Sequence, residues 1–227
     1  MVTISNSIVA PGFGDGDVIF TATGLSLVAL IGIASPNGQA DNITSLTLDG
    51  SGPTSAQSLN TPGSLGHLTL YFAYISAGSH TLSVLTGLGV FRYGVTVDIL
   101  AGVGPDAILY TDTSGTGTTA ALSTTPRTPD NVVSWLLSEG IATHTPTGTS
   151  LSSQLIGTLA TGRVRLSSAY AASGAHSWTL SSSSPWTIFN DLARGTAATV
   201  GVPTNVSVPV NVGVPTNVCL PSHPTFY

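Results

Sequence analysis

A six-residue rhythm of proline and valine runs through the last 28 residues of this chain and restricts them to an extended conformation. The units open at Pro203, Pro209 and Pro215. Because six is an even number, the rhythm places eight valines on even positions: Val200, Val202, Val206, Val208, Val210, Val212, Val214 and Val218. Successive side chains of an extended chain point to opposite faces, so these valines are expected to form one apolar stripe.

The prolines determine which edge of this segment can pair with another strand. Proline has no backbone N–H, and N–H groups alternate between the two edges of a strand, so prolines at odd positions remove donors from one edge only. The pattern therefore predicts an edge strand, or a strand added to the sheet of another chain. The partner-binding residues are expected to be the eight valines and the three prolines. The alternative, a flexible linker with an accidental rhythm, leaves the shared parity of the valines unexplained.

The small number of charges limits the possible partners. Only 7% of the 227 residues are charged, none is lysine, and the net charge is -5. Phosphate recognition needs several basic side chains on one face, whereas Arg163 and Arg165 are only two and are expected to be strand-surface charges. The longest apolar run, residues 25–34, is too short to cross a bilayer. We expect no nucleic-acid binding and no membrane insertion.

The single cysteine and the N-terminal residues bear on the cellular compartment. Cys219 has no partner within the chain, so neither an intramolecular disulfide nor a cysteine metal cluster is possible. The first residues lack a positive region followed by an apolar one, which predicts that the protein is made in the host cytoplasm and not secreted.

Residues 1–195 alternate between apolar and polar side chains in many short segments, which predicts antiparallel β-strands. Asn131 to Ser138 fits a helix or a strand, and its valines and Trp135 favour the strand. Residues 111–129, rich in Ser, Thr, Gly and Pro, are expected to form a long surface loop. The predicted fold is an all-β, two-sheet antiparallel sandwich, jelly-roll-like, over residues 1–195, with an extended arm over residues 196–227.

Several segments resemble a β-sandwich domain found in tailed-phage virion proteins and some bacterial surface proteins. They are the apolar strand at 27–33, the strand and Asp-Gly turn at 43–50, the strand at 70–75 and its hairpin partner at 79–84. The most specific part runs from Arg163-Val-Arg-Leu through Ser177-Trp-Thr-Leu-Ser to Trp186. The resemblance covers roughly residues 5–195 and implies a virion β-sandwich, most like a capsid decoration (cement) protein.

No group of residues has the spacing of a known catalytic or metal site. Asp15 and Asp17, in a glycine-rich turn, are weak candidates for calcium, and we expect them to be solvated turn carboxylates. The five histidines are scattered singly, and no Gly-x-Ser-x-Gly nucleophile motif occurs. We therefore predict no enzymatic activity and no cofactor.

The aromatic residues allow one further kind of site. They could form a sugar-stacking platform, or they could pack in the core with their polar ends at the surface. The residues in question are Trp135, Trp178, Trp186, Tyr71, Tyr74, Tyr93 and Tyr170.

The sequence thus leads to three functional hypotheses. The first is a cement protein on the capsid exterior that binds the major capsid protein and copies of itself, as a homotrimer by analogy, and stabilises the capsid through its C-terminal arm. The second is a carbohydrate-binding module of a phage tail fibre or baseplate. The third is a self-assembling filament subunit that uses the arm as a donor strand.

Overall fold

The computed structural model describes residues 3–13, 15–36, 43–86, 92–122, 131–158, 162–171 and 176–195. The chain divides into two compact units, residues 1–197 and 198–227, and every described residue belongs to the first. The described residues form antiparallel strands and no helix, so the predicted all-β antiparallel sandwich is confirmed.

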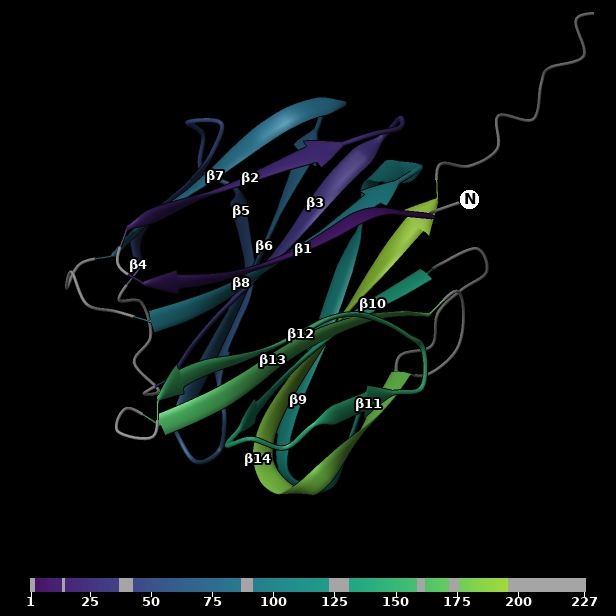
Figure 1. Ribbon diagram of the computed structural model, residues 1–227. Helices are drawn as coiled ribbons and strands as arrows, with labels where there is room; N and C mark the ends of the chain where they lie inside the picture. Colours follow the sequence, from purple (N-terminus) through teal and green to yellow (C-terminus); the bar gives the residue numbers. More distant parts are fainter. Residues whose placement is uncertain are drawn as a thin grey trace, which may run out of the picture. The chain divides into compact units, whose positions relative to one another are not determined.

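The first eight strands form two sheets in jelly-roll order (Figure 1). The central sheet has the order β1-β8-β3-β6-β5 and the outer sheet the order β2-β7-β4. Consecutive strands mostly alternate between the two sheets, as in a jelly roll. The bounds are β1 Thr3–Phe13, β2 Gly16–Ala22, β3 Leu27–Pro36, β4 Ile43–Leu48, β5 Thr54–Asn60, β6 Gly66–Ile75, β7 Gly78–Thr86 and β8 Arg92–Ala101.

Strand β5 departs from a complete jelly roll, in which it would lie beside β4. After β4 the chain turns through Asp49 and Gly50, whose φ angles are 53° and 80°. Such a two-residue turn with both φ angles positive favours Asp-Gly. Ser51 then pairs with Leu48 for a single bridge, after which Gly52 and Pro53 end the hairpin. Strand β5 therefore pairs with β6 in the central sheet.

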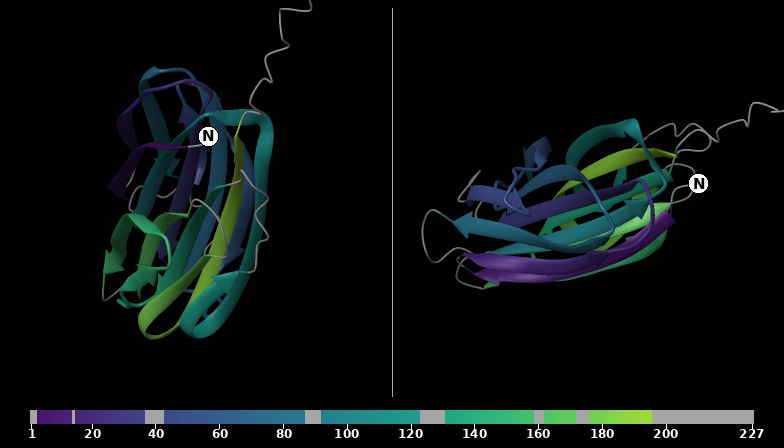
Figure 2. Two further views of the ribbon diagram at one scale, coloured as in Figure 1. Left: turned by 90° about the vertical axis from the view of Figure 1, so that its right-hand side faces the viewer. Right: turned by 90° about the horizontal axis from the view of Figure 1, so that it is seen from above.

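The last six strands form a third sheet, the C-terminal sheet, which the sequence did not predict. Its order is β11-β14-β10-β13-β12, and β9 pairs with β14. The bounds are β9 Val103–Leu122, β10 Asn131–Glu139, β11 His144–Pro146, β12 Thr149–Thr158, β13 Gly162–Ala171 and β14 His176–Gly195. Figure 2 shows these strands gathered on one side of the central sheet.

The central sheet is buried on both faces, which explains the uninterrupted apolar run near residue 30. On β3, Ala29 and Ile31 pack in a cluster with the outer sheet, while Val28 and Leu30 pack in a second cluster with β10, β12 and β13. A strand covered on both sides needs apolar residues at every position instead of alternate ones.

A third apolar cluster lies on the other face of the C-terminal sheet. Strand β14 is irregular between Thr179 and Ser184, and its first half, with Trp178 and Leu180, packs with Leu136 and Ile188. Trp178 Nε1 donates a 2.8 Å hydrogen bond to Ser134 Oγ on β10. The first half of β14 thereby covers the sheet to which its second half belongs.

The loop predicted for residues 111–129 is wrong for its first part, because residues 111–122 belong to β9. Strand β9 pairs with β14 over most of its length, for example Thr113 with Ile188. Backbone pairing does not require apolar side chains, and threonine is favoured in strands. Glycine is needed at 115, where a Cβ would lie 2.7 Å from the Trp186 ring.

Candidate functional site

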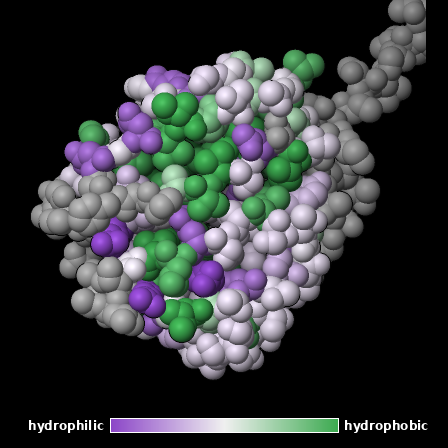
Figure 3. All heavy atoms as spheres, in the orientation of Figure 1, coloured by the Kyte–Doolittle hydropathy of each residue, from purple (hydrophilic) through white to green (hydrophobic). Residues whose placement is uncertain are grey.

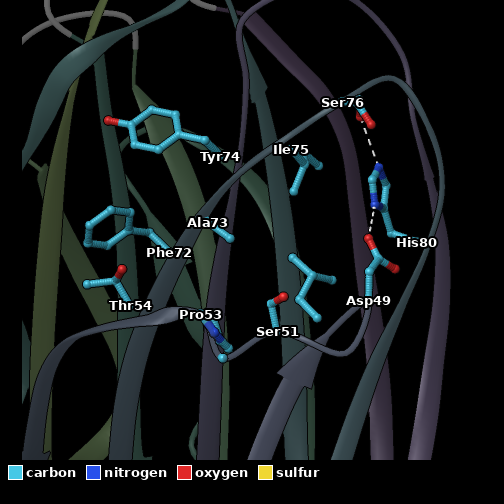
Figure 4. Close-up of a pocket in the computed structure, with 12 residues that line it drawn as sticks. Asp49, Ser51, Pro53, Thr54, Phe72, Ala73, Tyr74, Ile75, Ser76 and His80 are labelled. Carbon is cyan, nitrogen blue, oxygen red and sulfur yellow. Dashed lines mark hydrogen bonds and ion pairs between the residues drawn. The ribbon is translucent and has the colours of Figure 1, made fainter.

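A hollow of about 500 Å³ lies at the end of the jelly roll where three segments meet (Figure 4). Its lining comes from the β4–β5 connection, the last residues of β6 and the start of β7. This volume lies within the range of small-ligand sites, about 300–1,000 Å³. The hollow is the candidate functional site.

One wall of the hollow contains an ion pair between residues that are 31 positions apart. His80 Nδ1 donates to Asp49 Oδ2 at 2.6 Å, and His80 Nε2 donates to the Ser76 carbonyl at 2.9 Å. The N–H of Thr81 donates to the other carboxylate oxygen of Asp49 at 2.8 Å. These bonds fix the carboxylate in one orientation, although 48% of the Asp49 side chain remains exposed.

The hydrogen bonds determine the charge of both groups. Each ring nitrogen of His80 faces an oxygen that can only accept, so the ring carries both protons. Burial lowers the pKa of His80, but the bonds to Asp49 and Ser76 and the charge of Asp49 outweigh it, and the pKa lies above its ordinary value. The His80 hydrogen bond and the Thr81 N–H lower the pKa of Asp49. The pair is therefore ionised and its two charges cancel.

The arrangement of His80 does not suit acid–base catalysis. A general base needs a ring nitrogen within reach of the proton that it removes, whereas both nitrogens of His80 are bound to other groups. The pair instead links the β4 hairpin to the start of β7.

The end of β6 also lines the hollow, with Phe72, Ala73, Tyr74 and Ile75. Phe72 and Tyr74 point to one side of β6 in Figure 4, away from the ion pair. Their ring centroids lie 6.2 Å apart with the planes at 87°, an edge-to-face contact that supports the Tyr74 ring. Tyr74 is half exposed. Ala73 and Ile75 point to the other side of β6, toward the ion pair.

The seven aromatic residues do not come together in one platform. Trp135, Trp178 and Trp186 are buried core residues, and Tyr93 is buried in the cluster between the central and outer sheets. Tryptophan can occupy either a core or a surface position, and the sequence did not distinguish the two. Of the seven residues, Tyr74 alone lines the hollow.

The two calcium candidates, Asp15 and Asp17, are in different environments. Asp15 accepts hydrogen bonds from the backbone N–H and hydroxyl of Thr86, at 2.6 and 3.2 Å. Asp17 is exposed on β2. Within the described ranges, no group of three His, Cys, Asp or Glu side chains is placed to hold a metal ion.

The remaining candidate residues fall in two classes. Arg163 and Arg165 lie two positions apart on β13, and a guanidinium N–H of Arg165 donates to Ser153 Oγ at 3.2 Å. The arm residues, from Val200 to Val218 with Pro203, Pro209 and Pro215, lie outside the described residues.

A buried carboxyl that the sequence did not single out lies between the central and C-terminal sheets. Asp98 is fully buried on β8 and accepts a 2.5 Å hydrogen bond from Ser7 Oγ on β1. Burial raises its pKa to about 6, against the opposing effect of the Ser7 hydrogen bond and of the nearby polar groups of Ser168 and Trp135. Asp98 is enclosed and therefore belongs to the core of the fold, apart from the hollow.

Part of the Asp49–His80 pair is recognisable in the sequence. Asp49-Gly50 is recognisable as a turn and His80 as the start of a strand. Their contact depends on the register in which Leu48 lies opposite Leu82, and this register is set by long-range pairing.

The surface around these features carries few charges. Figure 3 shows hydrophobic side chains gathered over the upper strands and pale colours over the C-terminal sheet, as expected for Ser, Thr and Gly. No helix able to span a membrane occurs in the part of the chain that the structure describes.

Comparison with protein-family models, with curated proteins and with solved structures found no match for this chain.

Proposed function

We propose that this protein is a structural component of a phage particle, a capsid decoration protein that binds the outer capsid surface through its C-terminal arm. The observation that carries the proposal is the shared parity of the eight valines between residues 200 and 218, with the prolines on the other parity. Such a segment can bury one face and pair by one edge, which suits addition to the sheet of a partner. The expected partners are the major capsid protein and copies of this chain in a homotrimer.

The head has an extensive core of its own, which supports a head that folds without the arm. Among the residues whose burial the structure describes, the buried members of the three apolar clusters come from residues 18–189. A donor-strand protein would be expected to lack part of its core until a neighbour supplies it. This observation favours decoration over the donor-strand filament.

Two edge strands of the head are poorly suited to receive the arm of another copy. Strand β1 carries Pro11 and a bulge between Ile4 and Asn6. Strand β4 has a bulge between Ile43 and Ser45, and its last residue is bridged to Ser51. Prolines and bulges on edge strands limit pairing with other chains, so neither β1 nor β4 is well suited to accept the arm of another copy.

The proposed role is non-enzymatic. It is supported by His80, which is bound at both nitrogens, and by the separation of Asp15 from Asp17 described above. Under this proposal the protein works on the capsid exterior by adding buried contact area between subunits.

The test compares the two faces of the arm in co-sedimentation with capsids. Changing Val206, Val208, Val210 and Val212 together to Ser removes about 1.5 kcal/mol or more of burial per valine, so binding should fall by several kcal/mol.

The matched control changes Asn205, Ser207 and Asn211, on the opposite face, and should cost little. Equal losses from the two sets of changes, or no loss from either, would contradict the proposal.

A further inference from the structure

We propose that the open edge of β2 pairs with β2 of a second copy of this chain, antiparallel and about a two-fold axis. The outer sheets of the two copies, with the order β2-β7-β4 in each, then join into one continuous sheet. The contact does not involve the arm and is independent of capsid binding. Because a two-fold contact joins copies in pairs, in a homotrimer it connects one trimer to the next.

The backbone of Ile19 is directed to the open side of β2. Strand β2 lies at one end of the outer sheet (Figure 1), and Ile19 lies opposite Thr81 of β7. The backbone groups of Thr81 point away from β2, because its carbonyl accepts from the Asp49 N–H at 2.9 Å and its N–H donates to Asp49 Oδ1 at 2.8 Å. Opposite residues of an antiparallel pair exchange both backbone bonds or neither. The N–H and carbonyl of Ile19 therefore face away from β7.

The residues two positions to either side of Ile19 follow the same alternation. Asp17 and Thr21 also direct their backbone groups to the open side. The Thr21 carbonyl accepts a 3.1 Å hydrogen bond from Asn6 Nδ2 on β1, in agreement with this direction. A carbonyl oxygen has two lone pairs, so Thr21 can accept a bond from an added strand as well. The edge thus offers backbone partners at three alternate residues.

Strand β2 lacks the features that keep other edge strands of this protein from pairing. Its seven residues contain no proline, and its pairing with β7 runs through all of them without a register shift. Strands β1, β4, β5 and β12 each have a register shift. The middle of β2 carries Ile19, whose side chain is 69% exposed. A regular edge strand with an exposed apolar residue at its centre is a template for strand pairing.

The sequence of β2 is complementary to itself. Ile19 is the middle residue of Gly16–Ala22, so a register centred on it pairs all seven residues. Ile19 then exchanges both backbone bonds with Ile19 of the second copy, and the two side chains lie together on the outer face. Asp17 lies opposite Thr21 of the second copy, whose hydroxyl can donate to the carboxylate. The two Asp17 residues are about 13 Å apart, which keeps like charges separated.

The inner face of the joined sheet is also matched. In this register Val18 lies opposite Phe20 of the second copy, and both belong to the apolar cluster between the central and outer sheets. Ile8 and Ala10 on β1 pack against that cluster and are only half-buried. An added strand extends the apolar face of the outer sheet beyond β2. This match on both faces favours a second copy of β2 over an unrelated strand.

Disulfide trapping in the full-length protein tests the register, in a Cys219→Ser background. Residues that exchange both backbone bonds have Cα atoms about 5.5 Å apart, within the range of a disulfide. Ile19→Cys should therefore form a disulfide-linked dimer under mild oxidation. The matched control Asp17→Cys, on the same face of β2, should not link to itself across about 13 Å. A mixture of Asp17→Cys and Thr21→Cys should link.

A charge substitution tests the contact without a cross-link. Lysine on an edge strand opposes pairing, so Ile19→Lys should raise the dimer dissociation constant about tenfold or more, as measured by analytical ultracentrifugation. The control Leu25→Lys places the same charge at a residue that is more exposed than Ile19, between β2 and β3. It should associate as the unchanged protein does. Melting temperatures establish that each variant is folded.

Several results would overturn the inference. They are no dimer of the unchanged protein, no more linked dimer from Ile19→Cys than from Asp17→Cys, and equal dissociation constants for Ile19→Lys and Leu25→Lys. With Cys219 retained, a disulfide from position 19 of Ile19→Cys to Cys219 in preference to the 19–19 link would show that the arm occupies this edge instead. None of these measurements uses capsids, so failure of this inference is distinguishable from failure of the decoration proposal.

Discussion

At the scale of single residues, close contacts between the sheets decide which side chains the core tolerates. Gly32 on β3 faces the C-terminal sheet, where a Cβ would lie 2.8 Å from Thr96 Oγ1 and 3.0 Å from Trp135 Cδ1. Both neighbours are fully buried. The glycine is therefore required by the approach of Trp135, and its backbone conformation is not the reason.

We expect Gly32→Ala to lower the free energy of unfolding by about 1–3 kcal/mol, the usual cost of overpacking a core. The control is Gly52→Ala, because a Cβ at Gly52 meets nothing within 4 Å and should change stability by less than about 0.5 kcal/mol. Urea unfolding measures both, and equal stability of the two variants would contradict the assigned contact.

Asp98 should make stability depend on pH. Its pKa of about 6 in the folded protein exceeds the ordinary value of 3.8. Its contribution is therefore fully present below about pH 4 and is lost as the pH rises through 6, roughly 3 kcal/mol in all. Asp98→Asn should remove this component from the unfolding free energy measured between pH 4 and pH 8.

The second variant for this site is Ser7→Ala. It removes a hydrogen bond to the ionised carboxyl, so the loss of stability should become larger and extend to higher pH. If Asp98→Asn and the unchanged protein have the same pH profile, Asp98 is not the group responsible.

At the scale of elements, the first half of β14 and strand β11 form a cover over the C-terminal sheet that contains one half-buried and one buried histidine. His144 on β11 contacts Ser138 Oγ and Ser167 Oγ at 2.7 and 2.9 Å. His176 is fully buried, and neither of its ring nitrogens has a hydrogen-bond partner among the described residues. Both rings lie beside Trp178.

Acid should loosen this cover. Burial lowers the pKa of His176 to about 4, and burial together with the charge of Arg165 lowers that of His144 to about 3. Because both lie below the ordinary 6.5, the stability they contribute is present above pH 6.5 and is lost as the pH falls toward 4 and then 3. The loss for His176 is roughly 3 kcal/mol at most.

His176→Phe should reduce this acid lability, since it keeps a ring beside Trp178 and removes the titration. Hydrogen exchange at pH 5 and pH 7, corrected for the intrinsic pH dependence of amide exchange, measures the effect, with lower protection at pH 5 expected first in β11 and residues 176–180 of the unchanged protein. The strands of the outer sheet are the internal control. Uniform acceleration across all strands would show that the cover does not open locally.

At the scale of the whole molecule, the described residues build a three-layer arrangement of sheets. The central sheet shares one apolar cluster with the outer sheet and another with the C-terminal sheet. Strand β14 contributes Phe189 to the cluster between the central and C-terminal sheets, and Trp186 and Ile188 to the third apolar cluster. The core therefore depends on β14.

A chain ending at Gly195 should fold. We expect its circular dichroism spectrum to show β-structure and its melting temperature to lie within a few degrees of the full chain. A chain ending at Ser184 loses those three side chains and should not fold, because each large core deletion costs about 3–5 kcal/mol. Failure of the chain ending at Gly195 to fold would favour the donor-strand hypothesis.

The sequence by itself determined the strand character of this protein. Period-two alternation shows which side chains of a strand share a face, and this was enough for segments such as Trp178 and Leu180 against Thr179. The strand propensity of the valines and Trp135 favoured strand over helix at residues 131–138, which lie in β10. The parity of the arm is likewise a property of the sequence alone, and its binding role stays a prediction.

Only the tertiary structure decided which sheets the strands join and what covers their second faces. The third sheet, the strand at residues 111–122, the burial of the three tryptophans and the Asp49–His80 pair all depend on contacts between distant segments. Alternation is a local property, whereas strand order and register are set by the collective burial of apolar faces across the whole chain. The hollow beside Tyr74 exists because Gly52 and Pro53 lead the chain from one sheet to the other, and that path becomes visible only when both sheets are in place.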